Sequence, residues 1–277
     1  MSVTARRIVL TLVALGVTAC FALPLVWLIA SSLRPASETL GPASSLSLRA
    51  IVPHGFTLDN FQGMVDSGFL RNLGNSLLVA AVTVAAGLLV CAMAAFALAA
   101  IEFPGRNVVF GVVVVSFLIP FESIAIPLST TFRGWGLADS YAALVLPGIG
   151  NGLAVFTLRQ FFLGIPRELR DAAMVDGAGW WRIFWRIYVP LSRPALIGAG
   201  LVLFLFQWQA YLWPVLIVSN EAQDVAPVTL AKTFGAFTND YGRTFAETVT
   251  ISIIPALLLL ALQRQFVESI KSTGSKG

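Results

Sequence analysis

Six long apolar runs constrain this chain more than any other feature. The hydrocarbon core of a bilayer is about 30 Å thick, so a helix needs about 20 mainly apolar residues to cross it. Runs of that length cover residues 8–33, 73–101, 108–130, 141–162, 194–218 and 245–263. The sequence therefore predicts an all-α membrane protein, a single transmembrane domain over residues 1–277 with six membrane-spanning helices.

The composition favours a surface covered by lipid rather than by water. Hydrophobic residues make up 57% of the chain and charged residues only 12%, whereas an average soluble domain is roughly 25% charged. The net charge of +4 does not predict nucleic-acid binding, because the cations lie between apolar runs and not on one exposed face. A lone histidine, His54, predicts no metal site. Cys20 and Cys91 lie in apolar segments and indicate no disulfide framework.

The first and sixth runs need separate arguments. Arg6 and Arg7 precede the first run, as in a cleaved signal peptide, but the run is longer than a signal core and Pro24 interrupts it. It is therefore expected to remain as the first span. The sixth run has only 16 uncharged residues between Glu247 and Arg264. Glu247 is expected at the outer interface or in a polar lumen, because a carboxylate in lipid is costly.

The distribution of cations predicts the orientation. Six spans place both termini on one side, and twelve of the 18 lysine and arginine residues fall in segments on that side. Cytoplasmic loops are enriched in Lys and Arg, so both termini are predicted to be cytoplasmic. The largest outer segments are then residues 34–72 and 219–244.

The segment between the fourth and fifth runs, residues 164–193, is too organised for a plain connector. Pro166 suits the first position of a short helix, and Glu168 lies near the positive end of its dipole. Gly177 can adopt the left-handed conformation that closes a helix.

A second helix is predicted from Trp180 to Tyr188, ended by Pro190 and Pro194 and with Trp180, Phe184 and Ile187 on one face. On shape alone two interpretations stay open. Small side chains around the bend would let another protein approach the backbone closely, or the two helices rest among lipid headgroups as an amphipathic pair.

The same segment carries a family resemblance. From Ile165 to Ala178 it reads Ile-Pro-x-Glu-Leu-x-Asp-Ala-Ala-x-x-Asp-Gly-Ala, which closely resembles the EAA loop of the membrane-spanning subunits of binding-protein-dependent ABC importers. Asn75-Ser76, Phe103–Arg106 and Trp208–Pro214 look like the carbohydrate-importer branch, in particular like the second permease subunit of the maltose importer.

This resemblance implies the type I ABC importer permease fold, with a coupling helix from about Glu168 to Gly177 that docks in a groove of a separate ATPase subunit. The implied coupling residues are Glu168, Asp171, Ala172, Ala173, Asp176, Gly177 and Ala178. Asp171 stands where the family usually has Glu, which shortens its reach by one methylene. The last residues, from Glu268 to Gly277, also depart from the family's Gly-rich ending.

The resemblance further implies a set of partners in the bacterial inner (plasma) membrane. They are a homologous permease subunit in a heterodimer, two ATP-binding subunits and an extracytoplasmic solute-binding protein. The chain has no phosphate-binding loop of the G-x-x-x-x-G-K-[ST] type, so ATP and Mg²⁺ are expected on the partner ATPase and no cofactor on this chain. No catalytic residues are predicted, because the only histidine lies outside every run and a nucleophile inside the membrane would need a base.

Polar residues inside apolar runs predict an interior-facing path, because they are costly in lipid. The candidate substrate-path residues are Glu122, Asn151, Gln207, Trp208, Gln209, Tyr211 and Trp213. Amides can pair with sugar hydroxyls and aromatic faces can cover sugar C–H groups. Alternatively, the aromatic residues form an interfacial belt and Gln207 bridges to a neighbouring helix.

Glu122 lies between Pro120 and Pro127, where helical hydrogen bonds are interrupted. Its carboxylate is expected to accept from freed N–H groups, in a gating or structural role rather than in a proton relay.

The resulting hypothesis is a permease subunit of an ATP-driven importer of a sugar or related polyol. A permease for another solute class, such as amino acids, peptides or phosphodiesters, would share the coupling loop. An ATP-independent transporter or channel is the third alternative.

Overall fold

The computed structural model describes residues 3–35, 55–235 and 240–274, and these residues form helices and turns without any strand. His54 lies outside the described residues. The helices fall into two compact units, one within Met1–Arg71 and Thr229–Ile254, the other within Asn72–Val228 and Pro255–Gly277. The single domain over residues 1–277 stays a prediction.

The first unit contains α1 (Val3–Ser32), α2 (Asp59–Asp66), most of α13 (Ala226–Gly235) and the first half of α14 (Tyr241–Gly274). Asn60 of α2 holds the end of α1, because its Nδ2 donates to Ser32 O at 2.8 Å and to Arg34 O at 2.7 Å. The last carbonyls of a helix have no donor of their own. A Cβ added at Gly242 would collide with the Asn60 amide, so a larger residue there would displace the side chain that holds the end of α1.

Glu247 of α14 has a partner that the sequence analysis did not foresee. Its side chain is fully buried, and Oε1 accepts from Arg243 Nε at 2.9 Å one helical turn away. Arg243 Nη2 also donates to Thr233 Oγ1 at 3.3 Å. The charge that is costly in an apolar run is therefore offset in part within the first unit itself, through Oε1, while the buried Oε2 accepts no hydrogen bond from the described residues.

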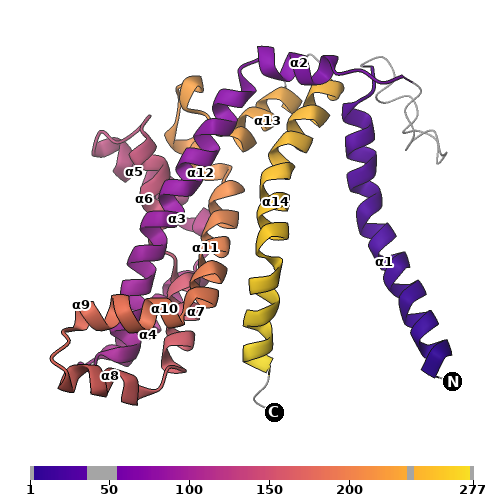
Figure 1. Ribbon diagram of the computed structural model, residues 1–277. Helices are drawn as coiled ribbons and strands as arrows, with labels where there is room; N and C mark the ends of the chain where they lie inside the picture. The colour runs from indigo at the N-terminus through magenta and orange to yellow at the C-terminus, as the bar shows by residue number, and fades with distance from the viewer. Residues whose placement is uncertain (1–2, 36–54, 236–239, 275–277) are drawn as a thin grey trace. The chain divides into compact units, whose positions relative to one another are not determined.

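The second unit is built around α3 (Phe69–Ala100), which Figure 1 shows as one uninterrupted helix. One core cluster surrounds the C-terminal half of α3. In it the Tyr188 ring lies 4.8 Å from the Phe96 ring and 5.5 Å from the Phe162 ring. A second cluster surrounds Val79 near the other end, where Trp213 lies 5.3 Å edge-on to Phe132.

Around α3 lie three pairs of shorter helices. They are α4 (Arg106–Leu118) with α5 (Phe121–Gly134), α6 (Tyr141–Ile149) with α7 (Gly152–Leu163), and α11 (Arg193–Trp208) with α12 (Leu212–Ile217). The bend is 96° between α4 and α5 and 41° between α6 and α7.

The predicted fifth span, residues 194–218, is wrong as a single helix, because α11 ends at Trp208 and α12 begins only at Leu212. Pro214 has no N–H to donate to Ala210 O four residues earlier, which stops the helix from continuing. Pro120 interrupts the third span in the same way.

Within the residues that the structure describes, three helices are long and apolar enough to cross a membrane, α1, α3 and α14. Up to six spans result if each of three bent pairs crosses once, namely α4 with α5, α6 with α7, and Trp180–Leu191 with α11. The number of six spans therefore stays a prediction.

Candidate functional site

The segment expected to couple to an ATPase begins with α8 (Arg167–Val175), which exposes nearly all of its side chains. Pro166 precedes this helix as its N-cap rather than occupying the first helical position. Glu168 lies in the first turn, where the helix dipole favours a carboxylate. No residue of α8 is buried, and Val175 is 88% exposed. Most of the predicted coupling residues therefore lie on an outer face of the second unit, whereas Ala173 and Ala178 pack against its core.

Gly177 has the left-handed conformation that its position predicts. Its φ is +78°, its N–H donates to Met174 O at 3.0 Å, and the Ala178 N–H donates to Ala173 O at 2.9 Å. This pair of bonds is a Schellman motif, which satisfies carbonyls at the end of a helix. No atom lies within 4 Å of a Cβ added at Gly177. The requirement for glycine comes from the backbone, and the outer side of the bend is open.

The helix after the bend differs from the prediction at its C-terminal end. The predicted helix from Trp180 to Tyr188 continues through α9 (Trp180–Ile183), a π-helical turn η4 (Phe184–Tyr188) and α10 (Val189–Leu191). The helix does not stop before Pro190, because it ends one residue later, at Leu191. It therefore ends between Pro190 and Pro194.

The aromatic face of this second helix packs inward. Phe184 is 2% exposed and its ring lies 5.3 Å from Phe96 of α3, while Trp180 lies 6.2 Å from the same ring. Trp181 and Trp185 remain exposed on the other side. Of the predicted stripe, Phe184 is thus part of the core of the second unit and Ile187 packs against it, whereas Trp180 remains partly exposed.

A residue that sequence reasoning missed ties α8 to α3. Arg170 Nη1 donates to Ala100 O at 2.9 Å, and its Nη2 lies 2.8 Å from Asp171 Oδ1. The hydrogen bond to Asp171 raises the pKa of Arg170 above its ordinary value. No local pattern identifies this contact, because Ala100 is 70 residues away.

The candidate substrate-path residues have unlike surroundings. Glu122, Gln209 and Tyr211 are exposed. Glu122 lies in the first turn of α5, and no side chain caps that helix, so the structure does not show freed N–H groups donating to its carboxylate as expected.

Four other candidates pack within the second unit. Asn151 Oδ1 accepts from Ala154 N at 3.0 Å and caps α7. Trp208 is buried, with its ring stacked 5.3 Å from Phe204. The Gln207 side chain packs against Gly148 of α6. A Cβ added at Gly148 would lie 2.7 Å from Gln207 Oε1.

Trp213 satisfies a carbonyl that a proline leaves without a donor. Pro147 of α6 has no N–H for Ala143 O, four residues earlier, and Trp213 Nε1 donates to that oxygen at 2.9 Å. Its side chain is 4% exposed. Its hydrogen-bonding capacity is therefore used within the protein.

Cys91 of α3, which the sequence left without a role, lies at the α6–α7 break. Its Sγ is 3.5 Å from Ile149 O and 3.6 Å from Asn151 O. Backbone groups at membrane depth need hydrogen-bond partners, and the Cys91 thiol, although a weak donor, is placed to supply one at this break.

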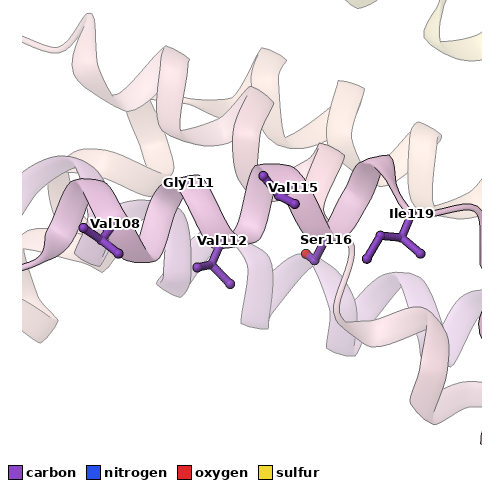
Figure 2. Close-up of a pocket in the computed structure, with 6 residues that line it drawn as sticks. All are labelled: Val108, Gly111, Val112, Val115, Ser116 and Ile119. Carbon is purple, nitrogen blue, oxygen red and sulfur yellow. The ribbon is translucent and has the colours of Figure 1, made fainter.

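One face of α4 is apolar and not covered by the described residues. It forms a shallow hollow lined by Val108, Gly111, Val112, Val115, Ser116 and Ile119, as Figure 2 shows. Among the residues that the structure describes, no group of three His, Cys, Asp or Glu side chains could hold a metal ion.

Comparison with known proteins identifies the family. The family described as binding-protein-dependent transport system inner membrane component matches residues 87–272. The chain is 32% identical to the arabinooligosaccharides transport system permease protein AraQ of Bacillus subtilis (strain 168), over 98% of this chain and 96% of that protein. It is also 32% identical to the trehalose transport system permease protein SugB of Mycobacterium tuberculosis, over 92% of each chain.

Two further proteins broaden the comparison. The sn-glycerol-3-phosphate transport system permease protein UgpE of Yersinia pestis is 33% identical over 71% of this chain and 70% of that protein. The crystal structure of a bacterial ABC transporter involved in the import of the acidic polysaccharide alginate contains a chain with the same fold. The TM-score is 0.81 and the sequence identity 20%, over 96% of this chain and 98% of that chain.

Proposed function

The chain belongs to the family of binding-protein-dependent transport system inner membrane components, and we propose that it is the permease subunit of an ATP-driven importer of sugars or related polyols. The observation that carries this proposal is the likeness to permeases named for arabinooligosaccharides and trehalose over more than nine-tenths of the chain. The permease named for sn-glycerol-3-phosphate extends the solute class to polyol phosphates.

In the proposal this chain is a multi-pass protein of the bacterial inner membrane with both termini in the cytoplasm. The assembly that it forms contains four further subunits. They are a homologous permease, two ATP-binding subunits that hold ATP and Mg²⁺, and an extracytoplasmic solute-binding protein. This chain itself carries no catalytic group in the proposal.

The exposed face of α8 and the bend after it support docking to an ATP-binding subunit. Helix docking in a groove needs small or apolar residues and a few charges that fix the register, and the exposed Ala172, Glu168 and Asp171 of α8 provide both. ATP can drive transport only if it favours one of two conformations over the other. The coupling residues in this proposal remain Glu168, Asp171, Ala172, Ala173, Asp176, Gly177 and Ala178.

The break between α4 and α5 supports a solute path at that place. Non-helical backbone at membrane depth is tolerated only where it is buried in protein or lines a water-filled cavity. Residues 117–124, which include Glu122, are exposed in this chain. We therefore keep Glu122, Gln209 and Tyr211 as path residues that face the partner permease or the solute, and assign Trp213 and Asn151 to structural roles.

The test is to purify the chain in mild detergent, identify associated chains by mass spectrometry, and measure uptake into proteoliposomes of labelled trehalose, an arabinooligosaccharide and sn-glycerol-3-phosphate. ATP-dependent uptake of one of them is expected. Uptake without ATP, or purification without any ATPase chain, would instead favour a transporter or channel that needs no ATP.

A variant at Gly177 tests the docking role within the same assay. Gly177→Val forces a β-branched side chain into a left-handed conformation, which costs roughly 1–2 kcal/mol or more. ATP-driven uptake should be lost while the chain still inserts, whereas Gly179→Val, at a glycine with φ −74°, should retain most of it. Normal uptake by the Gly177 variant would contradict docking at the bend.

A further inference from the structure

The C-terminal end of α3 is held by three arginines from other segments. Arg170 of α8 donates to Ala100 O, Arg159 of α7 donates from Nε to Leu98 O at 3.0 Å, and Arg106 donates to Ile101 O at 3.3 Å. The last carbonyls of a helix lack intrahelical donors and carry the negative end of its dipole. Cations therefore stabilise this end, and one of them belongs to the coupling segment.

The other end of α3 holds the loop that follows α12. Asn75 Nδ2 donates to Ala222 O and to Asp224 O, each at 2.9 Å, while its Oδ1 accepts from Tyr141 at 2.8 Å. Next to it, Ser76 Oγ accepts from Ala226 N at 2.8 Å. All of these bonds lie within the second unit. A single helical turn thus fixes most of residues 222–226.

The two sets of bonds lie on one rigid element that is longer than a bilayer core. From Asn75 to Ala100 a helix rises about 38 Å at 1.5 Å per residue, whereas the hydrocarbon core is about 30 Å thick. Of the three long helices, α1 contains Pro24 and α14 contains Pro255, but α3 has no proline. Proline is the usual cause of sharp kinks.

We propose that α3 is the transmission rod between the ATPase-docking segment and the loop at residues 219–226, with Arg170 and Asn75 as its two positioning residues. A displacement of α8 moves the end of α3 through the Arg170–Ala100 bond. The unkinked helix carries it across the membrane, and Asn75 and Ser76 pass it to the loop. This inference rests on the proposed function, because α8 moves only if an ATPase docks on it.

The test uses the complete complex and follows hydrogen–deuterium exchange in residues 219–228, with Mg-ATP and orthovanadate as the probe. In the wild-type complex the probe should change the exchange rate of this segment by about fivefold or more, the lower range of allosteric couplings. In Arg170→Gln and in Asn75→Ala the change should shrink below about twofold. Arg170→Lys should recover part of it, because one ammonium donor still reaches Ala100 O.

The matched control is Arg167→Gln, which removes the same charge from the same helix. Arg167 lies 3.8 Å from Glu102, and both side chains are mostly exposed, so the wild-type response should persist. Tyr141→Phe removes only one bond of Asn75 and gives a milder variant if Asn75→Ala fails to assemble. The change in exchange rate in Tyr141→Phe should be smaller than in wild type and Arg167→Gln, and larger than in Arg170→Gln.

A full wild-type response in Arg170→Gln, or an unchanged loop in a wild-type complex that hydrolyses ATP, would overturn the rod. A chain that assembles with no ATPase would instead refute the proposed function, and the inference with it.

Discussion

The second unit contains one long straight helix, α3, and one sharply bent helix pair, α4 and α5. The first runs for 32 residues without a proline, whereas the second turns by 96° at Ile119 and Pro120. Both derive from long apolar runs, but the run of α4 and α5 contains Pro120 at the bend, where an N–H is needed, and also Glu122 and Pro127. An unbroken helix can pass a displacement along its length. A broken one exposes backbone groups that must find partners elsewhere.

The α6–α7 pair shows how such partners are found within the chain. Pro147 and the 41° bend leave Ala143 O and Ile149 O outside regular helical bonding, whereas Asn151 O accepts from Val155 N at 3.1 Å. Trp213 donates to Ala143 O, and the Cys91 thiol of α3 lies 3.5 Å from Ile149 O. The straight helix therefore also stabilises the bend of its neighbour.

Breaking α3 itself should have the largest effect. Ala85→Pro removes the N–H that donates to Ala81 O and places a ring against that carbonyl, which costs about 3 kcal/mol or more. Complex assembly or ATP-driven uptake should be lost. Ala85→Leu at the same exposed position should change stability by less than about 0.5 kcal/mol. Uptake at the wild-type rate in the proline variant would mean that α3 need not be continuous.

The sequence predicts much of this architecture because apolar length and proline are local signals. It locates the helices of the six runs, the exposed helix of α8 and the left-handed Gly177. It also identifies Pro120 as a place where helical hydrogen bonds are interrupted, but not Pro147 or Pro214. The sequence does not tell whether an apolar run is buried in protein or faces lipid, because both surroundings favour the same apolar residues.

The sequence does not predict which side chains replace the missing donors. Trp213 and Ala143 are 70 residues apart, as are Arg170 and Ala100, and Asn75 lies 147 residues from Ala222. Such bonds depend on how helices pack, and periodicity within one helix carries no information about them. For the same reason Trp213 was predicted as a sugar contact, although its N–H has a partner in the structure.

A double-mutant cycle tests whether Trp213 compensates for Pro147. Trp213→Phe leaves Ala143 O without a donor and should cost about 1–3 kcal/mol, besides any packing lost. In the Pro147→Ala background a backbone N–H is available to Ala143 O, so the same substitution should cost less. The measurement is unfolding of the purified complex by SDS titration in mixed micelles. Equal losses in both backgrounds would show that Trp213 acts by packing alone.

The smallest expected effect concerns the loop that follows α12. Besides its bonds to α3, this loop is bonded to the turn between α5 and α6. Asp139, between α5 and α6, accepts from the N–H groups of Ser219 and Asn220, and these bonds hold the pKa of its carboxyl below the ordinary value. A lowered pKa stabilises the loop at pH values above the ordinary pKa of about 3.9, and this contribution disappears as the pH falls through the lowered pKa.

Acidification below about pH 3.9 should therefore accelerate amide exchange at Ser219 and Asn220 relative to their intrinsic rates, by a small factor because Asp139 is exposed and screened. Asp139→Asn keeps an acceptor oxygen and tolerates the left-handed backbone at φ 54°, but has no carboxylate to protonate. The acid step should vanish in that variant. If it persists, a titrating group other than Asp139 causes the acid step, because the Asn75 amide of α3 does not titrate in this range. The turn between the broken helices then contributes nothing to the loop through its carboxylate.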